Sequence, residues 1–167
     1  SAMLNAQNDS NLTSDALAER FGTAKRIRHK NLIPFSSSRK YSAVQFERYG
    51  TFVLGAPEFV IKENFQKIER EVEKQSSDGY RVLVVAYSDG DIVEHKVTGK
   101  VEPLALIMIE DTIRPDAIDT IEYFESHNVE IKVISGDNPA TVARISQRAG
   151  IANADKFISL EGVQDKE

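Results

Sequence analysis

The sequence contains no cysteine and no long apolar stretch. Without cysteine, a disulfide-stapled scaffold and a thiolate metal site are excluded, and the chain fits a reducing compartment. The longest apolar runs, 82–87 and 104–109, are much shorter than the roughly 20 residues that a helix needs to span a bilayer. We therefore expect no transmembrane helix in these 167 residues.

Several motifs that carry common chemistries are also missing. The sequence has no GxxxxGKS/T phosphate loop, no GxGxxG dinucleotide loop and no GxSxG nucleophile elbow. Its three histidines are isolated from one another along the chain, so together with the lack of cysteine they indicate no zinc site.

The composition that remains suits a soluble globular chain. Hydrophobic residues make up 41% and charged residues 28% of the 167 positions, enough for one domain, or for one domain and part of a second. The net charge of −5 divides into +4 over residues 1–40 and −9 over residues 41–167. A net-acidic protein is a poor candidate for nucleic-acid binding, whereas a local basic region suits a small anion such as a nucleotide. Scattered, solvated lysines and arginines would give the same charge pattern.

The first hundred residues predict an antiparallel sheet with a few flanking helices. Apolar runs between turn residues indicate strands at 27–34, 41–47, 51–54, 80–87 and 91–95. Helical spacing indicates a helix that Thr13 caps and that ends near Gly22, a helical turn at Pro57, and a charged helix over 64–75.

From about Pro103 the sequence predicts strands and helices that alternate along the chain. Strands are predicted at 104–109 and 130–134, and helices at 114–127 and 138–149. This alternation is typical of a partial doubly wound parallel sheet of βαβα order. We therefore predict an α/β (α+β) chain with a mainly antiparallel domain over 4–103 and the beginning of a parallel domain over 104–167.

The segment Ser135-Gly136-Asp137 lies where a predicted strand passes into a predicted helix. Ligands of doubly wound sheets bind at the carboxyl ends of strands, and a helix N-terminus favours phosphate. Ser135 could donate to a phosphoryl oxygen, and Asp137 could bind a metal ion or a lysine. Asn138 and Pro139 also make an ordinary helix start, so capping alone would explain the segment.

The end of the preceding predicted strand carries Asp111 and Arg114. The two carboxylates of Glu110 and Asp111 could serve Mg²⁺, and the Arg114 guanidinium could bind two phosphate oxygens at once. Capping of the following helix by Asp111 or Thr112 is the alternative.

A third segment, 34–40, joins an aromatic ring to small hydroxyls and two cations. Phe35 could stack on a base while Ser37 and Lys40 hold a phosphate, although a phenylalanine beside a strand is more often a core residue. Spacing alone places Gly55 in a turn and Arg81 at the exposed start of a buried strand.

Together and in this order, these segments resemble the cytoplasmic part of P-type ATPases, the cation pumps that form an aspartyl-phosphate. The resemblance covers about residues 12 to 155. It rests on five stretches of sequence: PFSSSRK, VLGAPE, GYRVLVVAY, EDTIRP and VISGDNPATVARISQRAGI. It also implies that the second part of the chain has the haloacid dehalogenase type of sheet.

For the first part of the chain, the resemblance implies a nucleotide pocket. Phe35 would stack on the adenine, Ser37 and Lys40 would belong to its pocket, and Gly55 would let the backbone come close to the base. Leu54 departs from the family, which usually has a lysine there, and Ser14 stands where many members carry glutamate. The pocket would therefore be more apolar, and nucleotide binding weaker.

For the remaining residues, the resemblance implies contacts with the phosphates. Arg81 would reach the phosphate groups, and Asp111 and Arg114 would act at the hinge between the two domains. The loop of Ser135, Gly136 and Asp137 would approach the γ-phosphate and the phosphorylated aspartate.

The resemblance also implies the activity of an intact pump. ATP would pass its γ-phosphoryl group, with Mg²⁺ offsetting charge, to an aspartate expected before residue 4, and hydrolysis would drive a cation across the membrane. The segment that binds Mg²⁺ is expected after residue 167. This chain alone would be a soluble, monomeric, inactive fragment from the cytoplasmic face of the membrane, with ATP as its ligand and no nucleic-acid partner.

Two other functions are the alternatives. A soluble phosphatase or phosphotransferase of the haloacid dehalogenase type would share only the second sheet, but no DxD sequence ends a strand there. A non-catalytic interaction module would have a buried Phe35 and no pocket beside Lys40.

Overall fold

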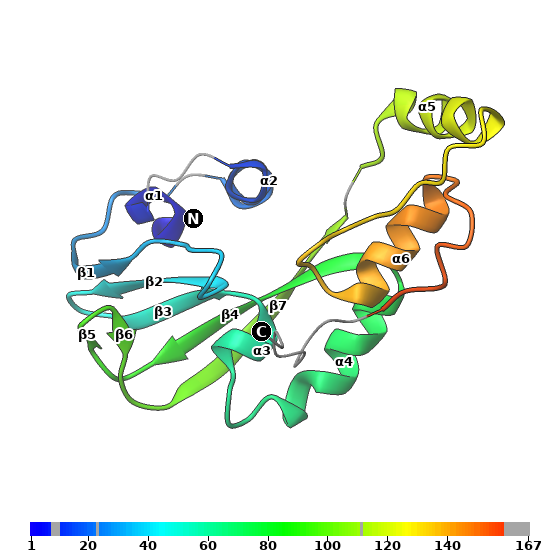
Figure 1. The fold of residues 1–167 in the computed structure, drawn as a ribbon. Helices are drawn as coiled ribbons and strands as arrows, with labels where there is room; N and C mark the ends of the chain where they lie inside the picture. Colours follow the sequence, from blue (N-terminus) through cyan, green and yellow to red (C-terminus); the bar gives the residue numbers. More distant parts are fainter. Residues whose placement is uncertain (8–10, 23, 111, 159–167) are drawn as a thin grey trace. The chain divides into compact units, whose positions relative to one another are not determined.

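A computed structural model describes residues 1–7, 11–22, 24–110 and 112–158 (Figure 1). The chain divides into two compact units. Unit 1 comprises Ser1–Glu69 and Val82–Ile107, and unit 2 comprises Arg70–Arg81 and Met108–Glu167. Within the described ranges no helix is long and apolar enough to cross a membrane.

Unit 1 contains most of a five-stranded sheet in the order β1-β2-β3-β4-β7. The pairs β1–β2, β2–β3 and β3–β4 are antiparallel. The strands are β1 His29–Ile33, β2 Tyr41–Phe46, β3 Gly50–Gly55, β4 Tyr80–Ser88 and β7 Val101–Glu110. The antiparallel sheet that the sequence predicts for the first hundred residues is confirmed.

The register of β3 sorts its side chains onto two faces of the sheet. Val53 pairs with Ala43 and Ala86, and all three side chains are buried. Leu54, the next residue, pairs with Ser42 and points to the opposite face, because side chains alternate along a strand.

The face that carries Val53 holds the core of unit 1. Helix α3 Pro57–Val60 begins with proline at its first position, as predicted, and brings Val60 and Ile61 against the strands. The core residues are Ile33, Ala43, Val53, Val60, Ile61, Val84, Ala86 and Ile92. Each fully buried valine or isoleucine contributes about 1.5–3 kcal/mol, so this cluster holds the strands and α3 together.

Two local predictions in unit 1 were wrong. Helix α2 Leu12–Phe21, which follows α1 Ala2–Gln7, is capped by Asn11 rather than Thr13, because the Asn11 side chain lies where it accepts from the Ser14 N–H at 2.9 Å. The predicted strand 91–95 is a tight hairpin of β5 Ile92–Val93 and β6 Lys96–Val97. The chain reverses at 94–95, where both residues have positive φ.

Unit 2 contains α5 Pro115–Ser126, α6 Pro139–Arg148 and the end of helix α4 Gln66–Ser77. These helices confirm the three helical segments that the sequence predicts there. The side chain of Asn138 caps α6, also as predicted, by accepting from Ala140 N at 3.0 Å and Thr141 N at 3.4 Å. The cap fixes the backbone at the start of α6.

The parallel βαβα unit was predicted wrongly for the described residues. Residues 130–134 form no strand, and Ile134 is 98% exposed. A parallel strand is stable only when a neighbouring strand takes its backbone hydrogen bonds, and no described strand pairs with 130–134. The predicted strand 104–109 does exist, within β7, but it pairs next to β4 rather than in a second sheet. The fold is therefore α+β.

Candidate functional site

The loop between β1 and β2 carries three of the predicted nucleotide-binding residues. Its backbone is closed by its own hydrogen bonds: Lys40 N donates to Ser36 O at 2.8 Å, and Arg39 N donates to Ser36 Oγ at 3.2 Å. The Arg39 guanidinium folds back on the same loop and donates from Nη2 to Pro34 O at 2.9 Å. One of the two predicted cations of this segment is therefore used to shape the loop.

The other side chains of this loop differ in their exposure. The ring of Phe35 is 51% exposed, so it is not a core residue, and the interaction module that requires a buried Phe35 is disfavoured. Ser37 is exposed and Lys40 is half-buried. Lys40 has φ 59°, a left-handed conformation that is uncommon outside glycine and that the closed loop imposes.

Leu54 and Gly55 end β3 beside this loop. A Cβ on Gly55 would lie 2.4 Å from Lys40 O and 2.4 Å from Tyr41 Cβ, so only glycine fits. Spacing alone placed Gly55 in a turn, but it is the last residue of strand β3. The resemblance implied that Gly55 lets the backbone come close to a base, and the structure shows Lys40 and Tyr41 as its close neighbours within the chain. Leu54 is half-buried, and its carbonyl accepts from Ser42 Oγ at 3.4 Å.

Unit 1 also has a cavity of about 180 Å³. Its wall includes Tyr41, Val53, Phe59 and Val60. Because Val53 and Leu54 point to opposite faces of β3, this cavity lies on the core side of the sheet. Phe35, Lys40, Leu54 and Gly55 are not among its lining residues, so it is not the predicted nucleotide pocket.

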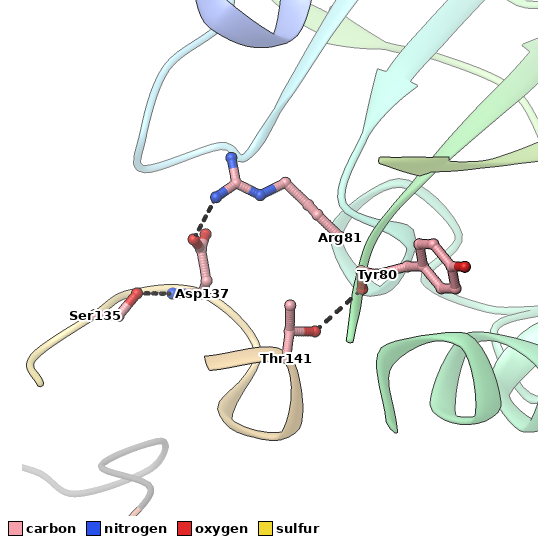
Figure 2. A network of polar contacts seen from close by, with 5 residues as sticks. All are labelled: Tyr80, Arg81, Ser135, Asp137 and Thr141. Carbon is pink, nitrogen blue, oxygen red and sulfur yellow. Dashed lines mark hydrogen bonds and ion pairs between the residues drawn. The ribbon is translucent and has the colours of Figure 1, made fainter. Parts of the chain in front are cut away.

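In unit 2, the start of β4 and the start of α6 are joined by two polar contacts (Figure 2). The Arg81 guanidinium donates from Nη2 to Asp137 Oδ2 at 2.8 Å. The Thr141 hydroxyl donates to the carbonyl of Tyr80 at 3.2 Å. Ser135 supports the loop, because its Oγ accepts from Asp137 N at 3.1 Å. The structure thus brings together Arg81, Ser135 and Asp137, which the sequence predicted separately.

The Arg81–Asp137 pair is open to solvent on both sides. The two side chains are 37% and 47% exposed, and an ion pair in such a setting is worth about 0–1 kcal/mol. Gly136, between Ser135 and Asp137, is exposed as well. This loop can therefore meet a ligand from solution.

The predicted hinge residues have a different arrangement. Asp111 lies outside the described residues. Arg114 is the N-cap residue of α5, and its guanidinium binds both carboxylate oxygens of Asp116, from Nε at 3.0 Å and from Nη2 at 2.6 Å. The hydrogen bond from Arg114 lowers the pKa of Asp116, and the same bond raises the pKa of Arg114. The alternative that Thr112 caps this helix is wrong, because Thr112 precedes the cap position by two residues.

Two residues of this site were missed at the sequence level. Thr141 is only 3% exposed. Its position three residues after the Asn138 cap of α6 could have indicated that it lies close to the loop. Asp116 follows Pro115 in the first turn of α5, where an acidic side chain interacts favourably with the helix dipole. Acidic side chains and histidines do not gather in threes as metal ligands anywhere in the described ranges.

Comparison with known proteins gives a family match over residues 5–165, described as a haloacid dehalogenase-like hydrolase. A Streptococcus pneumoniae protein named "Probable cation-transporting ATPase exp7" is 37% identical over 161 residues, which are 95% of this chain and 20% of that protein. The Mycolicibacterium smegmatis protein "Calcium-transporting ATPase CtpE" is 36% identical over 141 residues, 84% of this chain and 18% of that protein. Human "Plasma membrane calcium-transporting ATPase 4" is 28% identical over 111 residues, 62% of this chain and 9% of that protein. The chain therefore spans a fifth or less of the length of these relatives.

Proposed function

This chain belongs to the haloacid dehalogenase-like hydrolases, as part of the cytoplasmic region of a P-type cation-transporting ATPase, and we propose that it binds ATP. The observation that carries the proposal is the ring of Phe35, which is half-exposed on a loop whose own hydrogen bonds fix its backbone. An exposed aromatic ring on a loop of fixed backbone offers a base a stacking partner.

In unit 1, the proposed nucleotide contacts are those to the base. Phe35 stacks on the adenine, while Ser37 and Lys40 contribute a hydroxyl and a cation from the same loop. Leu54 supplies an apolar side chain where the family usually has a lysine, so we propose a weak site whose affinity depends mainly on stacking. Gly55 acts indirectly, because it lets β3 approach the backbone of Lys40 and so sets the end of the loop.

In unit 2, the proposed nucleotide contacts are those to the phosphates. Arg81 binds phosphate oxygens through its guanidinium, which suits their planar, bidentate geometry. The loop of Ser135, Gly136 and Asp137 lies at the N-terminus of α6 and faces the γ-phosphate. Asp111 and Arg114 belong to the hinge segment, in which Arg114 is held by Asp116.

The described residues do not by themselves fit a Mg²⁺ site. Mg²⁺ takes about six oxygen ligands, whereas Asp137 stands alone among the loop residues as a carboxylate and is already paired with Arg81. No metal-dependent step is therefore assigned to these residues.

The whole protein is proposed to couple ATP hydrolysis to cation transport through an aspartyl-phosphate formed on a residue outside this chain. Residues 4–103 then correspond to its nucleotide-binding domain and 104–167 to part of its phosphorylation domain, both on the cytoplasmic side of a membrane. Some relatives are named calcium-transporting and others only cation-transporting, so the cargo is proposed as a cation without naming the element.

An NMR titration of the ¹⁵N-labelled chain with ATP tests this assignment. We expect shifts of the backbone signals of Phe35, Lys40, Gly55 and Arg81, with much smaller changes at α3 residues such as Phe59. Shifts centred on the cavity beside Phe59 would place the ligand away from the assigned residues and would contradict the assignment.

A further inference from the structure

Arg81 and Asp137 contact each other, although both are assigned to the nucleotide phosphates. The Arg81 guanidinium donates to a carboxylate oxygen of Asp137 at 2.8 Å (Figure 2). A carboxylate and a phosphate present the same kind of acceptor to a guanidinium, namely oxygens that carry negative charge. The structure therefore shows Arg81 holding an anion that belongs to the chain itself.

The backbones on both sides of this ion pair are fixed by other contacts. Thr141 binds the carbonyl of Tyr80, directly before Arg81, and Asn138 caps α6, directly after Asp137. The Asp137 N–H is bound by Ser135 Oγ. These contacts hold the backbones of β4 and α6 in place, so separation of the ion pair is described as a rotation of the two charged side chains.

We propose that Asp137 is an internal substitute for phosphate at Arg81, and that a nucleotide polyphosphate binds by displacing it. This exchange rests on the proposed ATP site and describes how that site is regulated. A di- or triphosphate carries more negative charge than one carboxylate and can accept several of the guanidinium's hydrogen bonds, so it replaces Asp137. Adenosine has no such group and leaves the ion pair intact.

The exchange has a measurable cost for binding. The affinity for polyphosphate is reduced by the fraction of molecules in which Asp137 occupies Arg81. An exposed ion pair is worth only about 0–1 kcal/mol, so the paired and separated states of Arg81 and Asp137 differ little in free energy. Removing the Asp137 charge should therefore tighten polyphosphate binding by about 2- to 5-fold. The pair thus favours ligands with several phosphates over singly charged anions.

The test uses Asp137→Asn, which keeps the shape of the side chain and removes its charge. Calorimetric titrations with ATP, adenosine and inorganic tripolyphosphate are done in a chelator, so that no metal bridges Asp137 to the ligand. We expect about 2- to 5-fold tighter ATP and tripolyphosphate binding with adenosine binding unchanged. In the background of Arg81→Gln, Asp137→Asn should bring no gain, because the residue that makes the exchange is gone.

Glu102→Gln is the matched control for charge. Glu102 forms an exposed ion pair with Lys100 at 2.7 Å, and neither residue is assigned to the site. Removing this charge should leave all three affinities unchanged. An equal gain from Glu102→Gln would overturn the exchange, because it would show that net charge alone governs binding.

The remaining outcomes separate the exchange from the proposed function. If the wild-type chain binds ATP and Asp137→Asn binds it equally or more weakly, the exchange is overturned and ATP binding stands. If the wild-type chain binds neither ATP nor adenosine, the proposed function fails. In that case the exchange is tested separately, by following the NMR signal of the Arg81 Nε–H during a titration with tripolyphosphate. A shift of this signal that is larger in Asp137→Asn than in the wild type supports the exchange, and an unshifted signal overturns it.

Discussion

Thr141, on the first turn of α6, donates a hydrogen bond to the carbonyl of Tyr80 at 3.2 Å, and Tyr80 directly precedes Arg81. The contact joins positions 61 residues apart in the sequence and is partly shielded from water, because Thr141 is buried and Tyr80 is half-buried. Thr141 is therefore a positioning residue, which holds the start of β4 beside the loop that carries Asp137.

Replacing Thr141 by Val should destabilise unit 2 by about 0.5–1.5 kcal/mol, because the carbonyl of Tyr80 loses this hydrogen bond while the shape of the side chain is kept. Thr141→Ser keeps the hydroxyl and is the matched control. Hydrogen exchange of the amides in α6 measures the effect. Equal protection in the Val and Ser variants would show that the hydrogen bond contributes nothing.

Gly55→Ala should destabilise unit 1 by about 1–3 kcal/mol or more, because the added methyl would overlap backbone atoms of β2, which cannot rotate away as a side chain can. Urea unfolding measures the loss. Gly22→Ala is the comparison: its Cβ would meet nothing within 4 Å, so only its backbone conformation, with φ 67° and ψ −174°, costs stability, by about 1–3 kcal/mol. Gly55→Ala should lose more than this, and an equal loss in both variants would show that the close approach of β2 and β3 at Gly55 is wrong.

Asp116 should titrate at unusually low pH, because its hydrogen bond from Arg114 lowers the pKa of the carboxyl in the folded state. A lowered pKa stabilises the fold above the pKa of the unfolded chain, near 3.9, and this contribution is lost as the pH falls through the lower folded value. Arg114→Gln should return the pKa of Asp116 toward its ordinary value. The carboxyl carbon signal, followed by NMR from pH 6 to pH 2, measures both values, and an unchanged pKa in the variant would contradict the ion pair.

The sequence was sufficient to predict those elements whose structure depends on residues close together along the chain. The strands of the antiparallel sheet follow from apolar runs bounded by turns, and the start of α6 follows from Asn138 and Pro139. The start of α2 was misassigned by two residues, because Asn11 and Thr13 are both good caps and only the position of the Ser14 N–H decides between them.

The sequence was insufficient wherever partners distant along the chain decide the structure. The run 130–134 has the composition of a strand, but a strand needs a neighbour, and none of the described strands pairs with it. For the same reason β7 was placed in the wrong sheet. The individual residues Arg81, Ser135 and Asp137 were predicted, but the contact between Arg81 and Asp137 joins segments 56 residues apart and has no sequence signal.

The measurement that tests the central claim most directly is a calorimetric titration of ATP into the wild-type chain, Phe35→Ala and Phe59→Ala. Phe59 is the matched control, because it is also an exposed phenylalanine of unit 1 but lines the cavity on the core side of the sheet. Stacking on an aromatic ring is worth about 1–3 kcal/mol, so ATP should bind Phe35→Ala roughly 5- to 150-fold more weakly, while Phe59→Ala binds like the wild type. Equal ATP binding by Phe35→Ala and the wild type, or a loss confined to Phe59→Ala, would contradict the account.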